Sequence, residues 1–253
     1  MSELPVAVDR VADVLASMRG TVAVVLGGSR AQGASAAQSD WDLGVYYRGD
    51  LDTTALGRLG KVHPPGSWGR VMNGGAWLDV DGLKVDVLLR DLDMVEHWSA
   101  RAGEGEFEID ALLGYVAGVP TYSLAAERAV AVVLRGDART EEAFPAKLAE
   151  AAPARWRFCA DFSLAYARMH AVRGDRIATS AQAAKAIMEE AHARMCEARR
   201  WVLNEKRLVE TAELTHLQEG FGAIPDDPHS LVFWAEQLRD ALVGGRAAPS
   251  VLL

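Results

Sequence analysis

Two aspartates, Asp40 and Asp42, stand one residue apart where a polar segment gives way to the apolar run Leu43–Tyr47. In a strand that begins near Trp41, residues two apart point to the same face, so the two carboxylates project side by side. Like charges this close favour a bound cation, and oxygen ligands suit Mg²⁺, which takes one or two carboxylates together with substrate phosphates. The pair therefore predicts Mg²⁺ and a phosphorylated ligand.

A glycine-rich turn comes before this pair. Gly27, Gly28 and Ser29 directly follow the apolar run Val22–Leu26, and Arg30 comes next. The glycines let the main chain approach a phosphate closely, and Ser29 adds a hydroxyl and a backbone N–H at an expected helix N-terminus. Arg30 adds a permanent positive charge. These four residues are predicted to bind the phosphates of the ligand.

Two metal ions about 3.5 to 4 Å apart need a third carboxylate. The segment Trp77–Arg90 is predicted to form a hairpin, because Asp81-Gly82 is a strong turn signal between two apolar-rich runs. Asp86 is a polar residue in the otherwise apolar second arm, and a metal would supply the partner it needs. Asp79 and Asp81 are alternatives; Asp86 is preferred because the turn uses Asp81 and Asp79 lies beside it.

Gly28-Ser29, then Asp40-x-Asp42, then a later strand with Asp86 resembles the signature of the DNA polymerase β-like nucleotidyltransferase superfamily. Within it, the chain resembles the small bacterial members that include the aminoglycoside and lincosamide nucleotidyltransferases. The resemblance is carried by residues 20–90. It implies an α+β fold, in which an N-terminal mixed β-sheet with flanking helices is followed by a C-terminal helical bundle.

The same resemblance implies a reaction. Two Mg²⁺ ions, held by Asp40, Asp42 and Asp86, would act on a nucleoside triphosphate, and ATP is the commonest donor among such enzymes. A nucleotidyl group would pass in line to an acceptor, with pyrophosphate as the leaving group. A glutamate serves as general base in antibiotic-modifying relatives. No motif singles one out here, and the candidates are Glu127, Glu189, Glu190 and Glu205.

Hydrophobic periodicity predicts the elements that position these residues. In the first part of the chain, helices are expected at Val6–Met18, Thr53–Leu59, Leu92–Ala102 with Asp91 as cap, and Phe107–Val116. Glycine becomes sparse from Pro145 on, which predicts packed helices at Trp156–Val172, Ala181–Leu208 and Ser230–Leu242.

We therefore divide the chain into a catalytic nucleotidyltransferase domain, residues 1–140, and a helical substrate-binding domain, residues 141–253. The segment Tyr122–Leu134 could belong to either domain. The sheet is expected to end near Gly118-Val119-Pro120.

Composition limits the partners. The net charge of −8 argues against a surface that tracks nucleic acid, because such binding depends on Lys and Arg neutralising phosphates. No apolar stretch is long enough for a membrane span and no signal peptide is evident, so a cytoplasmic location is expected. The 2 cysteines and 6 scattered histidines do not suggest a transition-metal site. No sequence feature indicates an oligomeric state.

Three functions remain open for the acceptor. An acidic chain suits transfer to a hydroxyl of a cationic small molecule such as an aminoglycoside, which would confer antibiotic resistance. Alternatively, the acceptor is a protein or RNA, as in toxin–antitoxin relatives. The third alternative is a non-catalytic nucleotide-binding regulatory module.

Overall fold

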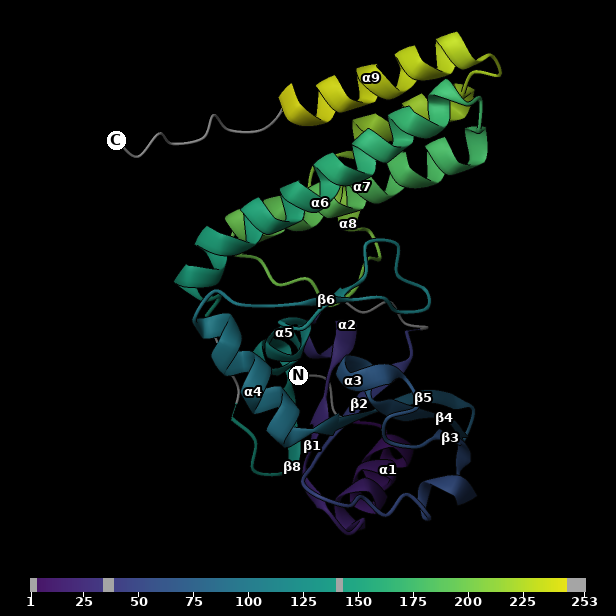
Figure 1. The fold of residues 1–253 in the computed structure, drawn as a ribbon. Coiled ribbons are helices and arrows are strands. Elements are labelled where there is room, and N and C mark those ends of the chain that lie inside the picture. The colour runs from purple at the N-terminus through teal and green to yellow at the C-terminus, as the bar shows by residue number, and fades with distance from the viewer. Residues whose placement is uncertain (1–3, 34–38, 140–142, 245–253) are drawn as a thin grey trace. The chain divides into compact units, whose positions relative to one another are not determined.

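A computed structural model describes residues 4–33, 39–139 and 143–244 (Figure 1). The chain packs as two compact units. The N-terminal unit comprises residues 1–112 and 119–145, and the C-terminal unit comprises residues 113–118 and 146–253. The first contains a mixed sheet and the second is helical, so the predicted α+β fold class is confirmed. The division into functional domains at residue 140 stays a prediction.

A six-stranded sheet forms the centre of the N-terminal unit, with the order β3-β4-β5-β2-β1-β8. Only β2 and β5 run parallel; the other neighbours are antiparallel. The strands are β1 (Thr21–Leu26), β2 (Trp41–Tyr47), β3 (Gly60–His63), β4 (Gly74–Val80), β5 (Leu83–Asp91) and β8 (Val132–Gly136). A separate two-stranded ladder joins β6 (Ile109–Asp110) to β7 (Val119–Pro120).

Alternating side chains give the sheet two different faces. Leu43 and Val45 of β2 and Val87 of β5 are fully buried in one hydrophobic cluster, which also contains residues of α1 (Val6–Ser17). The apolar stripe of α1 thus covers this face. Asp42 and Asp86 alternate with these core residues, so both carboxylates point to the other face.

The other helices of the N-terminal unit are α2 (Gly28–Ala31), η1 (Leu56–Arg58), α3 (Gly69–Met72), α4 (Leu92–Gly103) and α5 (Ser123–Val130). Asp91 caps α4 as predicted, because its side chain accepts a hydrogen bond from the backbone N–H of Asp93 at 2.9 Å. The buried Arg90 of β5 links this strand to α5, because its guanidinium donates hydrogen bonds to Glu127 of α5.

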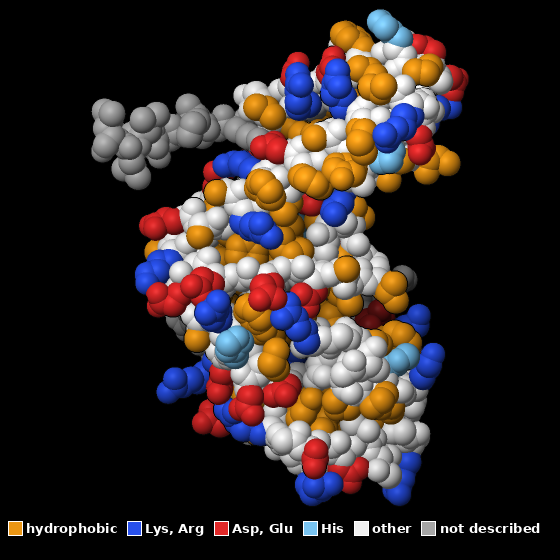
Figure 2. Space-filling view, viewed as in Figure 1, with side chains coloured by type: hydrophobic (Ala, Val, Ile, Leu, Met, Phe, Trp, Pro, Cys, Tyr) orange, Lys and Arg blue, Asp and Glu red, His pale blue; other side chains and the backbone are white. Residues whose placement is uncertain are grey.

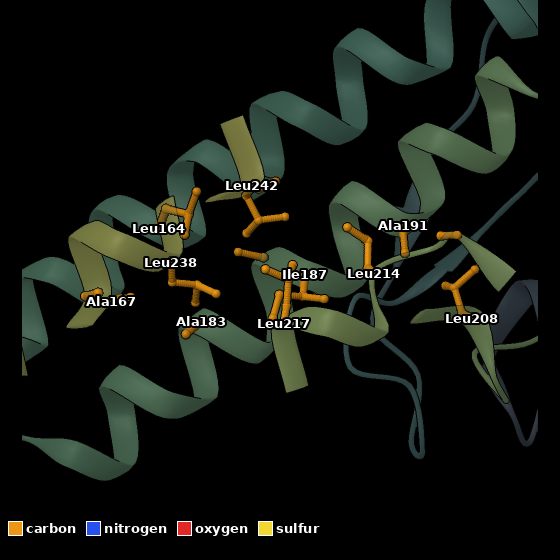
Figure 3. Close-up of a cluster of buried hydrophobic side chains, with 14 of the residues drawn as sticks. Leu164, Ala167, Ala183, Ile187, Ala191, Leu208, Leu214, Leu217, Leu238 and Leu242 are labelled. Carbon is orange, nitrogen blue, oxygen red and sulfur yellow. The ribbon is translucent and has the colours of Figure 1, made fainter. Parts of the chain in front are cut away.

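The C-terminal unit contains α6 (Ala146–Val172), α7 (Arg176–Glu197), α8 (Leu208–Thr211), η2 (Thr215–Ala223) and α9 (Pro228–Gly244). Figure 3 shows part of its core, where side chains of α6, α7 and α9 converge with leucines from the intervening segments. Alanines such as Ala167 and Ala183 keep the contact between α6 and α7 close, since small side chains let helices approach. The break between these helices at Gly174-Asp175 is as predicted.

Several predicted elements were wrong in extent or type. Residues 107–116 do not continue as a helix, because Ile109–Asp110 pairs with β7. The sheet does not end near residue 118, because β8 adds its outermost strand beside β1. The short helix predicted within Thr53–Leu59 is observed as the 3-10 turn η1. The long helix predicted to reach Leu208 ends at Glu197, where Arg199 adopts a left-handed φ of 52° and Arg200 N–H donates to Met195 O.

On the face shown in Figure 2, Lys and Arg side chains are interspersed with Asp and Glu side chains. Within residues 4–33, 39–139 and 143–244, no helix has the length and apolar character needed to cross a membrane.

Candidate functional site

Asp42 and Asp86 are partners in the parallel register of β2 and β5. Residues in register on neighbouring strands lie about 4.8 Å apart and project to the same face. Both side chains are half-buried on the face opposite α1. The structure therefore brings together two of the three predicted carboxylates, and the strand pairing holds them there.

Gly27 and Gly28 lie directly against Asp42. The N–H of Gly27 donates to the carbonyl oxygen of Asp42 at 2.8 Å, which extends the β1–β2 ladder by one residue. Gly28 has a φ of +60°, and a β-carbon added there would stand 1.9 Å from Oδ2 of Asp42. Only glycine fits this position, both because of its backbone conformation and because of the carboxylate beside it.

Ser29 and Arg30 follow in α2, which is a single turn. Arg30 was predicted to bind a phosphate, but in the structure its side chain contacts the backbone. Its Nε donates to the carbonyl oxygens of Ser39 at 3.1 Å and of Asp40 at 3.2 Å. Its guanidinium also lies 4.0 Å from the centroid of the Trp41 ring. Arg30 therefore fixes the backbone that enters β2, and so positions the strand that carries Asp42.

Asp40 is exposed and precedes the first residue of β2. Among the residues that the structure describes, no group of three or more His, Cys, Asp or Glu side chains is arranged to hold a metal ion. The donor set of Asp42 and Asp86 does fit Mg²⁺, which takes one or two carboxylates and completes its shell with water and phosphate oxygens. Asp40 as a third ligand stays a prediction.

The sheet register separates Asp86 from the two alternatives considered for its position. Asp79 lies opposite Lys84 on the antiparallel arm of the hairpin, away from the level of Asp42. Asp81 has a φ of 54° in the turn, and its carboxylate pairs with Arg10 at 2.6 Å. Asp86 alone of the three is in register with Asp42.

Glu127 has a structural role. Its carboxylate accepts hydrogen bonds from Nε and Nη2 of Arg90 at 2.6 and 2.8 Å. The Arg90 side chain is only 2% exposed, so Glu127 neutralises a buried cation. A carboxylate used in this way is poorly suited to act as a general base.

Glu189 and Glu190 lie in the helical core of the C-terminal unit. Glu189 accepts a hydrogen bond from Ser163 Oγ at 2.7 Å, and burial raises the pKa of its carboxyl group. Glu190 is fully buried and lies 3.3 Å from Nη2 of Arg157. Both side chains thus satisfy partners inside the unit.

Glu205 links two segments of the C-terminal unit through hydrogen bonds. Its two carboxylate oxygens accept hydrogen bonds from the backbone N–H groups of Val116 at 2.6 Å and Ala117 at 2.8 Å. This arrangement satisfies two consecutive backbone donors. All four glutamates considered as general bases therefore have partners within their own unit.

A cluster of aromatic rings beside Asp86 was missed by the sequence reasoning. Trp77 of β4 is in register with Asp86 and is 49% exposed. Its ring centroid lies 4.5 Å from that of His63 and 5.6 Å from that of Trp68. The available signal was the outward position of Trp77 in the hairpin alternation, together with Gly74-Gly75 just before it.

The known protein to which this chain is similar was found by its fold and not by its sequence. No family model matches the sequence, and no curated protein does so. Among solved structures, the chain is similar to a nucleotidyltransferase-like protein from Exiguobacterium sibiricum 255-15, with a TM-score of 0.48 and 11% sequence identity. The match covers 94% of this chain and 73% of that one.

Proposed function

We propose that the protein is a Mg²⁺-dependent nucleotidyltransferase that moves a nucleoside monophosphate from a nucleoside triphosphate, with ATP as the expected donor, to a hydroxyl of a small molecule. The observation that carries the proposal is the register of Asp42 with Asp86, with Gly28 lying against the first of these carboxylates. A turn of two glycines beside two adjacent carboxylates suits a phosphate chain together with a divalent cation.

Each residue has a proposed role. Asp42 and Asp86 hold Mg²⁺, with Asp40 as a further ligand, and the Gly27, Gly28 and Ser29 segment binds the outer phosphates. When bound, Mg²⁺ would neutralise the charge that develops on the phosphate oxygens and polarise the acceptor hydroxyl. The half-burial of Asp42 and Asp86 limits the water around the cation site.

The transfer is a single displacement at the α-phosphorus. The oxygen of the acceptor hydroxyl forms a bond to the α-phosphorus, and the bond from that phosphorus to the bridging oxygen of the β-phosphate breaks. Pyrophosphate leaves with the electron pair, and the hydroxyl proton passes to solvent. The products are a nucleotidylated acceptor and pyrophosphate.

The acceptor is proposed to be a hydroxylated antibiotic of the aminoglycoside or lincosamide type, which would make the protein a resistance factor. The support is the net charge of −8, because an acidic protein attracts cationic ligands. The interspersed charge on the visible face also fits a small ligand better than an extended nucleic acid.

Position-specific labelling of ATP tests the function. The protein is incubated with Mg²⁺, a panel of hydroxylated antibiotics, and ATP labelled at either the α- or the γ-phosphate. Nucleotidyl transfer puts the α-label on the acceptor and leaves the γ-label in pyrophosphate. The γ-label on the acceptor would indicate phosphotransfer instead and would contradict the proposal.

Two variants serve as matched controls. Asp42→Asn removes one charge from the proposed site and should abolish the α-label transfer. Asp79→Asn removes the same charge from the same sheet, opposite Lys84, and should leave transfer within about two-fold of wild type, as is usual for exposed sites. Label on protein or RNA would favour the macromolecular acceptor, and ATP binding without turnover, unchanged in Asp42→Asn, would favour a regulatory module.

A further inference from the structure

We propose that Trp77, supported by Trp68 and His63, forms the acceptor subsite, and that an uncharged sugar ring of the acceptor stacks on its indole. This inference rests on the proposed nucleotidyl transfer. It adds the place where the acceptor binds and the chemistry that the acceptor presents there. We call these three side chains the aromatic platform.

The platform is built into the sheet. Gly75 of β4 has no side chain, and an added β-carbon would stand 2.6 Å from Cζ3 of Trp68, so the Trp68 ring lies directly on the strand. The rings of His63 and Trp68 are 4.9 Å apart, and Trp77 completes the cluster at contact distance from both. Packed rings of this kind are rigid and offer a large contact area.

Asn73 holds the loop that carries Trp68. Its side chain donates to the hydroxyl of Tyr47 and accepts from the N–H of Gly66, both at 2.7 Å, while its carbonyl oxygen accepts from Trp68 N–H at 3.0 Å. Asn73 is 8% exposed. The hydrogen bonds tie the loop to β2, the strand that also carries Asp42, and so hold the platform in a fixed position relative to the carboxylates.

The sheet register determines whether the aromatic platform lies beside the acceptor or beside the nucleotide donor. Trp77, Asp86 and Asp42 occupy successive strands at one level, and Gly28 lies on the far side of Asp42. In-line transfer requires the attacking oxygen and the departing pyrophosphate to lie on opposite sides of the α-phosphorus. With the outer phosphates at Gly28 and the α-phosphate over the carboxylate pair, the acceptor lies on the Trp77 side.

A cation beside the platform selects against highly charged acceptors. Lys61 is in register with Trp77 on the neighbouring strand β3, and its Nζ lies 5.5 Å from the centroid of the Trp77 ring. A second cation stacked on the same ring would be repelled by the ammonium group. An uncharged pyranose instead places its apolar face on the indole and its hydroxyls beside Lys61. A lincosamide, with one amine distant from its sugar, fits better than a polyamine aminoglycoside.

Binding measurements separate the acceptor from the donor. Isothermal titration of the full-length protein uses lincomycin as the acceptor probe and α,β-methylene-ATP with Mg²⁺ as an unreactive donor. We expect Trp77→Ala to weaken lincomycin binding about 10-fold or more, the loss typical of a stacking contact, and to leave donor binding within two-fold. Trp77→Phe, which keeps a flat ring, should restore most of the affinity.

Val22→Ala is the control, since Val22 is an exposed apolar residue of β1 outside the proposed site, with 37% of its surface accessible. It should change neither affinity. Lys61→Ala should improve the binding of kanamycin, a polycation, relative to lincomycin. Thermal unfolding of each variant shows whether the fold is retained, and the rescue by Trp77→Phe distinguishes a stacking role from a merely structural one.

Three results would overturn the inference while the proposed function stands. The first is donor binding that weakens in Trp77→Ala while lincomycin binding does not, which would assign the platform to the nucleobase. The second is no change in either affinity. The third is donor binding by wild type without any binding of lincomycin. Failure to bind the donor at all would instead reject the proposed function, and the inference with it.

Discussion

Gly28 and the carboxylate of Asp42 are packed so closely that a single added carbon does not fit between them. The β-carbon of an alanine at position 28 would stand 1.9 Å from Oδ2 of Asp42. Such a distance forces the carboxylate to move, and with it one of the two side chains proposed to hold Mg²⁺. The contact links the glycine turn to the proposed cation site.

Gly28→Ala should therefore lower the rate of nucleotidyl transfer about 100-fold, since a displacement of about 1 Å in an active site has an effect of this size. Gly33→Ala is the control, because Gly33 also has a positive φ, +69°, but no atom of the described residues lies within 4 Å of an added β-carbon. Both variants should lose about 1 kcal/mol of stability from the left-handed backbone. Equal activity in the two variants would contradict the proposed role of the contact.

Removing either charge of the carboxylate pair tests the cation site directly. We expect Asp42→Asn and Asp86→Asn each to lower transfer at least about 100-fold, because a metal ion contributes several kcal/mol to such a transition state. The Mg²⁺ concentration that gives half-maximal rate should rise in both variants. Chelation of Mg²⁺ with EDTA should stop the wild-type reaction, and added Mg²⁺ should restore it.

Glu127→Gln tests whether this glutamate is a general base or a structural partner. The structure predicts a structural role, because the Arg90 side chain that it neutralises is 2% exposed. The free energy of unfolding should fall by about 1.5 to 3 kcal/mol, as for a lost hydrogen bond to a charged group. Transfer per folded molecule should stay within about three-fold of wild type, which falls short of the 100-fold or larger loss expected of a missing base.

A double variant provides the control for this pair. Arg90→Met combined with Glu127→Leu removes both charges. Its free energy of unfolding should fall by less than that of Glu127→Ala, because Glu127→Ala leaves the guanidinium buried without a counter-charge. Chemical denaturation measures all of these free energies. A fully stable but inactive Glu127→Gln would instead assign the base to this residue.

His192 should make the stability of the C-terminal unit depend on pH. Its ring stacks on Trp156 at 4.3 Å, neither ring nitrogen has a hydrogen-bond partner among the described residues, and burial lowers its pKa from 6.5 to about 3. The unfolded state therefore binds more protons than the folded state between these two values. The free energy of unfolding should fall as pH decreases from 6.5, by at most about 1.4 kcal/mol per pH unit from this group.

His192→Phe keeps the stacked ring and removes the proton. Between pH 6.5 and 4 its free energy of unfolding should decline less steeply than that of wild type. Denaturant midpoints across this pH range measure the slopes. Identical slopes in wild type and His192→Phe would show that His192 is not buried as a neutral ring.

Local chemistry allowed much of the N-terminal unit to be predicted. The hairpin turn at Asp81-Gly82 follows from residues that tolerate a positive φ, and the structure gives φ values of 54° and 77° there. The apolar runs predicted β1, β2 and β5, and the polar residue before Leu92 predicted the cap of α4. These features depend on neighbours in sequence, so the residue types determine them.

Long-range pairing decided the rest. That Asp86 and not Asp79 lies beside Asp42 follows from the register of the parallel strands β2 and β5, which are separated in the chain by two other strands. The contact of Arg30 with the backbone before β2 and the ion pair of Glu127 with Arg90 likewise join distant segments. Residue types show which groups can bind a cation or a base, but only tertiary packing selects the partner, because the free energy of each contact depends on what the fold buries beside it.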